Sequence, residues 1–90
     1  MDRREILQEA ERIICGDRQD DYGSASSSFE RIADLWRAYL GVDIEPMDVA
    51  NMMILLKVSR SITAPDKADT WLDIAGYAAL AGEMLAHGTE

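Results

Sequence analysis

The chain has little cysteine, little histidine and no long apolar run, and each shortage excludes a class of protein. Its single cysteine, Cys15, cannot form a disulfide within the chain, and we expect a packed thiol rather than a reactive one. Its single histidine, His87, lies near the C-terminus, which removes most histidine-based catalytic and metal sites. No apolar stretch approaches the roughly 20 residues needed to cross a bilayer. We therefore assign no catalytic residue, metal site or cofactor.

Basic residues are also scarce, with 9 Lys and Arg against 17 Asp and Glu and a formal net charge of −8. This balance argues against binding DNA, RNA or an anionic membrane through the general surface, although a local basic pocket for one small anion is compatible with it. The N-terminal stretch MDRREILQEAER is charged throughout, unlike a signal peptide. We expect a cytoplasmic protein, in the host cytoplasm if a phage encodes it.

What remains is typical of one small globular domain over residues 1–90. The composition is 48% hydrophobic and 29% charged, which excludes a disordered tail. A chain of this length buries only about 60% of its unfolded surface, so its core is marginal. We therefore expect a homo-oligomer, in which self-association buries more surface.

Apolar residues recur at helical spacing through most of the chain, and turn residues interrupt them. Gly16 and Gly41 are expected to end two helices, and a serine among residues 26–28 to cap the second. Pro46 favours a first helical turn, and Asp66 is expected to cap the last helix. The predicted fold is all-α, a compact four-helix bundle with helices at about 3–16, 26–41, 47–62 and 66–87.

The third predicted helix is apolar on nearly every side, which indicates a central position. Neighbours within the chain or a second subunit are expected to cover it. The fourth helix carries AGYAALAG in its middle, and such small residues let another helix approach closely.

Four charges lie where these two helices meet. Lys57 and Arg60 share one face of the third helix, and Asp69 and Asp73 share one face of the fourth. Counted outward from the short turn near Ala64, Arg60 is level with Asp69 and Lys57 with Asp73. A ladder of two ion pairs would explain how apolar helices tolerate these charges. Alternatively, the cations bind a phosphate-bearing ligand while the aspartates orient them.

Three neighbouring side chains would suit a nucleotide ligand. Trp71 and Tyr77 follow the predicted hairpin turn and could stack on a base, or they could belong to the core. Asn51 lies two turns before Lys57 and could contact a base edge or a ribose, or it could bond to a neighbouring helix. The sequence leaves each pair of alternatives open.

The segment RQDDYG precedes the second predicted helix and combines residues typical of a tight turn. Tyr22 could fold back over the bundle, and Arg18 is a further candidate for contacting phosphate. The start of a helix after such a loop is also a natural site for an anion.

The segments DDYG, F..IADLW..YLG, VANMMILLKVSR and D..WLDIAGYAAL together resemble a family of small phage and prophage proteins of uncharacterised function. The likeness covers roughly residues 18–80. The chain is also similar to the nucleotide-modification-associated domain of phage genomes, a helical module with a DYG-type loop. Both resemblances imply a phage setting and a role related to nucleotides.

A more distant resemblance is to the all-α nucleoside triphosphate pyrophosphatases of the MazG type. Those are helical oligomers with ExxE on one helix and ExxD on the next, which bind magnesium. Here the comparable helix offers Asp48 and Asn51, with one carboxylate, and the next offers Asp69 and Asp73 at a spacing of four. Lys57 and Arg60 would neutralise rather than assist a metal cage.

Three hypotheses follow from these observations. The first is a non-enzymatic homo-oligomer that sequesters a small nucleotide, by analogy with phage proteins that capture the nucleotide signals of bacterial defence systems. The second is a degenerate magnesium-dependent pyrophosphohydrolase that uses Asp48, Asp69 and Asp73. The third is a structural, protein-binding helical module whose acidic surface meets a basic partner.

Overall fold

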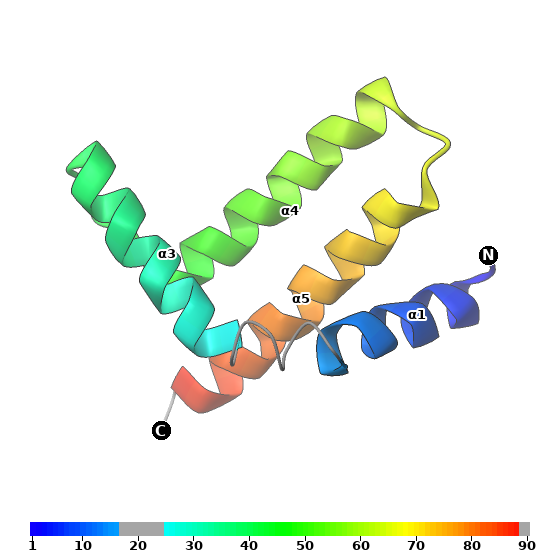
Figure 1. Ribbon diagram of the computed structural model, residues 1–90, viewed down its shortest axis with the longest axis horizontal. Coiled ribbons are helices and arrows are strands. Elements are labelled where there is room, and N and C mark those ends of the chain that lie inside the picture. Colours follow the sequence, from blue (N-terminus) through cyan, green and yellow to red (C-terminus); the bar gives the residue numbers. More distant parts are fainter. Residues whose placement is uncertain (17–24, 89–90) are drawn as a thin grey trace.

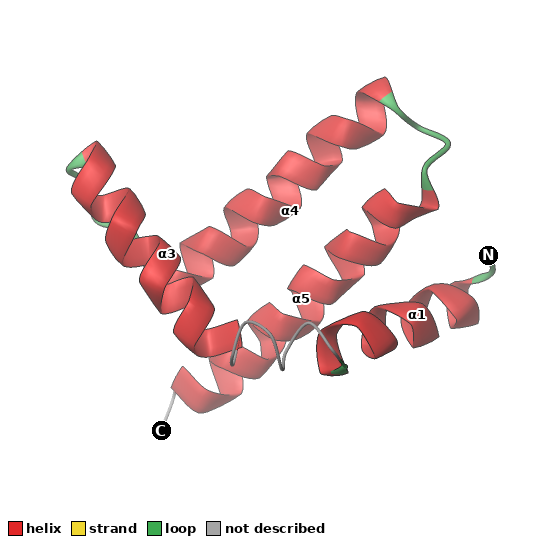
Figure 2. Cartoon of the chain, in the orientation of Figure 1, coloured by secondary structure: helices red, strands yellow, loops and turns green. Residues whose placement is uncertain are grey.

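The computed structural model describes residues 1–16 and 25–88, which form four α-helices with no strand between them. The helices are α1 (Arg3–Cys15), α3 (Ala25–Leu40), α4 (Pro46–Thr63) and α5 (Ala68–Gly88). The all-α prediction is confirmed, and the arrangement is compatible with a helical bundle (Figure 2).

Helices α4 and α5 form an antiparallel hairpin that is the centre of the fold (Figure 1). Helix α1 packs on α5, and α3 crosses the end of the hairpin where α4 begins and α5 ends. Among these four described helices, α1 contacts neither α3 nor α4. The bundle is therefore open, and its radius of gyration of 13.9 Å exceeds the roughly 12 Å of an average domain of this length.

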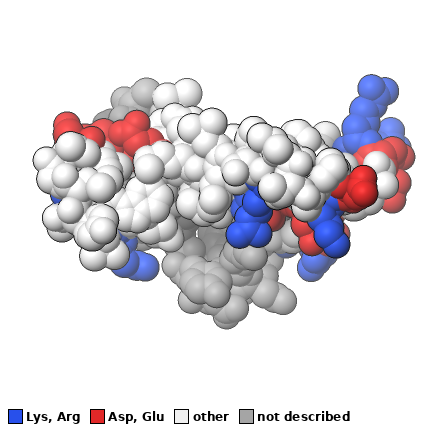
Figure 3. Space-filling model, turned by 90° about the horizontal axis from the view of Figure 1, so that it is seen from above, with Lys and Arg blue, Asp and Glu red and all other residues white. Residues whose placement is uncertain are grey.

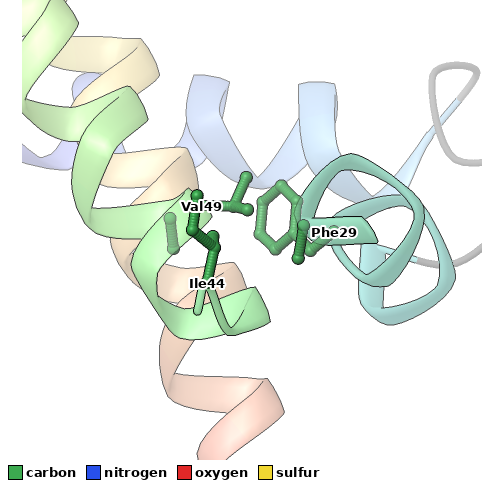
Figure 4. Close-up of a cluster of buried hydrophobic side chains, with 5 residues drawn as sticks. Phe29, Ile44 and Val49 are labelled. Atoms are coloured by element: carbon green, nitrogen blue, oxygen red, sulfur yellow. The ribbon is translucent and has the colours of Figure 1, made fainter. Parts of the chain in front are cut away.

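The core lies at the junction of α3 and α4 and is small. Phe29 on α3 points toward Val49 on α4, and Ile44 from the connector joins them (Figure 4). Val49 is fully buried, and Tyr77 on α5 stacks on Phe29 with ring centroids 6.3 Å apart. Because this cluster joins three of the helices, it holds the open arrangement together.

The α3–α4 connector is held by backbone and side-chain hydrogen bonds. The Arg37 guanidinium donates to the Ile44 carbonyl oxygen at 2.6 Å. The Asp48 carboxylate accepts from the backbone N–H of Glu45 at 2.9 Å, which satisfies the start of α4. Pro46 occupies the first turn of α4, where its missing N–H costs nothing.

Two expected helix caps are not found, although the helix starts differ from the predicted ones by only one or two residues. Helix α5 begins at Ala68, so Asp66 lies in the turn and does not cap it. Helix α3 begins at Ala25, so the serines at 26–28 lie inside its first turn rather than before it. Both differences are within the one or two residues by which frayed helix ends commonly vary.

The small residues of α5 permit the close approach that was expected of them. A Cβ atom built on Gly76 would lie 3.1 Å from Cγ2 of Ile14, a residue of α1. This distance is tighter than ordinary van der Waals contact, so glycine lets α1 lie directly against α5.

Two glycine substitutions are expected to change stability in opposite directions. Gly41 ends α3 with φ of +72°, a conformation that strains any residue with a Cβ atom. Gly41→Ala should lower the free energy of unfolding by about 1 kcal/mol. Gly82 lies within α5 with nothing within 4 Å of a built Cβ atom. Gly82→Ala should raise the free energy of unfolding by about 0.5–1 kcal/mol.

Urea denaturation followed by circular dichroism would measure both variants against the parent chain. Equal shifts of the same sign would contradict the proposed difference in backbone conformation.

Candidate functional site

A pocket of about 420 Å³ lies where the α4–α5 hairpin turns. The last hydrogen bond of α4 runs from the Ala64 N–H to the Arg60 carbonyl, and Pro65 follows, which cannot continue the helix. Four residues, 64–67, separate α4 from α5, and the chain reverses direction within them. The lining residues come from both helices and the turn, and they are Lys57, Arg60, Thr63, Ala64, Lys67, Asp69, Thr70 and Asp73.

One of the two predicted ion pairs is present. The Nζ atom of Lys57 lies 2.9 Å from Oδ2 of Asp73, and the two side chains are 16% and 28% exposed. This pair joins the two helices on the core side of the pocket, because both residues are further from the turn than the other charged lining residues. Because both side chains are partly buried, removing either partner would leave the other charge enclosed and uncompensated.

The second predicted ion pair is not formed. Arg60 and Asp69 both line the pocket, but they form no ion pair with each other. Neither of them forms an ion pair with any other described residue. Lys67 in the turn has no ion pair within the described residues either. The expectation that Arg60 and Asp69 would neutralise each other is therefore wrong for this structure. The charges of Arg60, Asp69 and Lys67 line the pocket without an ion-pair partner among the described residues.

The charge of the pocket is opposite to that of the whole chain. Three cationic residues and two carboxylates line it, so its formal net charge is +1 in a chain of net −8. Figure 3 shows charged side chains of both signs gathered toward the end of the molecule that holds the hairpin turn and the start of α1. A small anion would therefore meet a lining of net positive charge in a chain that is acidic as a whole.

Thr70 adds a hydroxyl group to the pocket. The residue is only 6% exposed and lines the pocket, and no other described residue forms a hydrogen bond with its hydroxyl. It also lies in the first turn of α5, where backbone N–H groups have no partner inside the helix. The backbone N–H of Thr70 itself is not free, because it donates to the Lys67 carbonyl oxygen at 3.3 Å. The N–H groups that stay free at the start of a helix are a usual feature of anion sites.

Three other residues predicted for the site lie outside the pocket lining. Trp71 is half-exposed and lies about 200° around the helix from Asp69, so it faces another direction. Tyr77 packs against the core through its contact with Phe29. Asn51 is exposed on α4, more than two turns from Arg60. Two further candidates, Tyr22 and Arg18, lie outside the described residues.

The described carboxylates do not form a metal-binding cluster. Within residues 1–16 and 25–88, no group of three or more His, Cys, Asp or Glu residues is placed to hold a metal ion. Asp48 accepts a hydrogen bond at the start of α4, about 14 Å along the helix from Lys57. It is therefore distant from Asp69 and Asp73, with which the pyrophosphohydrolase hypothesis had grouped it.

Sequence reasoning missed Lys67, Thr63 and Thr70 as lining residues. The signal was available, because counting outward from the turn places Thr63 and Thr70 beside the four charges. Charge drew attention to Lys57 and Arg60, whereas uncharged threonines in a turn are usually assigned to local hydrogen bonding.

Breaking the Lys57–Asp73 pair is expected to destabilise the fold. Asp73→Ala leaves the Lys57 ammonium half-enclosed and without its partner, so the free energy of unfolding should fall by about 1–3 kcal/mol. The double variant Lys57→Met with Asp73→Leu removes both charges and should lose less than Asp73→Ala alone. Urea denaturation of the variants measures both differences.

A surface ion pair provides the matched control. Asp34 pairs with Arg37 on α3 and its side chain is 68% exposed, so Asp34→Ala should cost at most about 1 kcal/mol. If Asp73→Ala were no more costly than Asp34→Ala, the partial burial of the hairpin pair would have no energetic consequence.

No helix within the described residues is long and apolar enough to span a membrane.

Comparison with known proteins places the chain in a phage setting. It matches the family described as "Domain of unknown function (DUF6378)" over residues 5–85. It is 52% identical over 80 residues to "Gene 55 protein" of Mycobacterium phage L5, covering 88% of this chain and 51% of that protein. It is 44% identical over 73 residues to "Gene 55 protein" of Mycobacterium phage D29, covering 81% and 48%. The chain thus spans about half the length of these relatives, and no solved structure matches it.

Proposed function

Because this chain belongs to the DUF6378 family of phage proteins, whose description states no activity, we propose its function from the hairpin pocket. The pocket binds a small phosphate-bearing ligand of the nucleotide class and holds it without turnover. The observation that carries this proposal is the presence of two cations, Arg60 and Lys67, that line the pocket and have no ion-pair partner among the described residues.

The two cations are chemically suited to phosphate in different ways. The planar guanidinium of Arg60 can form two parallel hydrogen bonds to phosphate oxygens, whereas the Lys67 ammonium acts as a compact point charge. The start of α5 also lines the pocket, and the first backbone N–H groups of a helix favour an anion. The pocket volume of about 420 Å³ falls within the roughly 300–1,000 Å³ of typical small-molecule sites.

The remaining polar groups explain why the ligand would carry hydroxyls as well as phosphate. Asp69 lines the same pocket and its carboxylate can accept hydrogen bonds, as from a ribose. The Thr70 hydroxyl can donate to a phosphate oxygen or accept from a sugar hydroxyl. A nucleotide presents both kinds of group on one small molecule.

Retention without turnover is favoured by the mixture of charges. Asp69 and Asp73 share the pocket with three cationic residues, and Asp73 is already paired with Lys57. Magnesium-dependent hydrolysis needs several carboxylates free to bind the cation. Sequestration of a nucleotide signal during phage infection is the biological role that this arrangement would serve.

Calorimetric titration would test the proposal with inorganic phosphate, adenosine and guanosine monophosphates and triphosphates, and cyclic dinucleotides. Binding of a nucleotide that is recovered intact after denaturation, with magnesium present, would support the proposal. Failure of every one of these ligands to bind would overturn it. Release of phosphate or pyrophosphate would instead favour the pyrophosphohydrolase hypothesis.

A further inference from the structure

The side of α4 that faces away from the rest of the chain carries a regular apolar seam. Met52, Leu55, Ser59 and Ile62 follow one another at spacings of three, four and three residues. This is the spacing of the contact positions in a helix that packs lengthwise against another helix. Leu55 is 65% exposed and Ile62 is 78% exposed, so no described part of the chain covers the seam.

The seam is also uncharged, in contrast to the rest of the acidic chain. Lys57 and Arg60, the charged residues of this stretch, line the hairpin pocket on the α5 side of the helix. Further exposed apolar side chains, Leu56 and Val58, flank the seam. In Figure 3 uncharged side chains form a white band across the upper middle of the molecule, above the Lys and Arg side chains. The seam therefore carries no charge that could attract an oppositely charged binding partner.

We propose that the α4 seam binds the α4 seam of a second copy of this chain, with the two helices antiparallel. The 3-4-3 spacing reads the same in both directions, so a two-fold axis near residue 57 superimposes the seam on itself. Met52 then packs opposite Ile62 of the second copy. Leu55 packs opposite Ser59 of the second copy, which places a large side chain against a small one.

Electrostatics decide where on the surface a second copy can dock and in which orientation. Two copies of net charge −8 repel each other over most of their surfaces, and the uncharged seam is where this repulsion is least. Antiparallel packing also sets the positive end of each helix dipole beside the negative end of the other.

The length of the seam sets the strength of the dimer. Helix α4 has 18 residues, or about 27 Å of helix at 1.5 Å per residue. One helix pair of that length buries less than the roughly 1,200–2,000 Å² of a standard stable interface, so the dimer belongs to the weak, reversible class. It forms at high protein concentration and dissociates on dilution.

Sedimentation velocity of the 90-residue chain over a wide concentration range tests the proposal. The expected result is a monomer at low concentration that converts to a dimer as concentration rises. Leu55→Glu places charge in the seam and should weaken self-association roughly tenfold or more. Leu35→Glu changes an equally exposed leucine on α3 and should leave it unchanged. Circular dichroism establishes that both variants remain helical.

A chain that is monomeric at every concentration would overturn the proposal, as would a dimer that Leu55→Glu does not weaken. Disulfide trapping tests the orientation in a Cys15→Ser background, which has no other thiol. The double variant Leu55→Cys with Ser59→Cys should form a cross-linked dimer under mild oxidation. Either single variant should not, because neither position faces itself. Cross-linking of Leu55→Cys alone would indicate parallel helices and contradict the proposed axis.

Discussion

Replacing Arg60 by alanine is expected to weaken nucleotide binding by about 10- to 100-fold while leaving the fold intact. A hydrogen bond to a charged group contributes about 1.5–3 kcal/mol, and each 1.4 kcal/mol is tenfold in affinity, so this range corresponds to the loss of about one such bond to phosphate. Arg60 is exposed, and its side chain forms no ion pair with any described residue. Its removal therefore costs the protein little stability of its own. Calorimetric titration with the tightest-binding nucleotide would measure the loss.

Two further variants make this result specific. Arg60→Lys keeps the charge but loses the planar fork, so its affinity should lie between those of the parent chain and Arg60→Ala. Arg31→Ala removes an exposed arginine of α3 that lies outside the pocket, and its affinity should match the parent. Equal losses in Arg60→Ala and Arg31→Ala would show a general charge effect and contradict a phosphate site at the hairpin.

Replacing Phe29 by alanine is expected to destabilise the chain enough to populate the unfolded state. Phe29 is buried at the α3–α4 junction, and it is the aromatic side chain that stacks on Tyr77. Truncating a buried phenylalanine costs about 3–5 kcal/mol. Domains have only about 5–15 kcal/mol in total, and one this small lies toward the lower end. Urea denaturation followed by circular dichroism would measure the effect, and the midpoint should be much lower than that of the parent chain.

Tyr39 provides the matched control for Phe29. It is an aromatic residue of the same helix with 88% of its surface exposed, so Tyr39→Ala removes a similar ring without opening a cavity. Its free energy of unfolding should remain within about 0.5 kcal/mol of that of the parent chain. A loss as large as that of Phe29→Ala would mean that the exposed end of α3 is covered by something outside the chain.

The hairpin shows how far sequence reasoning reaches into the site. Lys57 and Asp73 could be paired from the sequence, because a short turn fixes which residues of two antiparallel helices are level. The same count placed Arg60 beside Asp69, and both do line one pocket. Whether they touch depends on how the helices separate near the turn, and spacing along the chain contains no such information.

The aromatic residues show the opposite case. Trp71 and Tyr77 are close to the four charges in sequence, yet each lies outside the pocket lining. Tyr77 is drawn into the core by Phe29, a residue of another helix. Trp71 leaves the pocket because of its rotation around α5. The position of Tyr77 depends on packing between helices, which the sequence pattern does not specify. The position of Trp71 could have been predicted, because helical periodicity alone turns it away from Asp69.

By itself, the sequence determined the helices and one ion pair between them, because helical periodicity, caps and a short turn act over a few residues. The tertiary structure alone decided which sides of those helices are covered. Helix α4 is apolar on nearly every side, so its composition cannot distinguish the side that packs on α3 and α5 from the exposed seam of Met52, Leu55, Ser59 and Ile62. That choice depends on the angle at which α3 crosses the hairpin, which is set by packing around Phe29 and Val49.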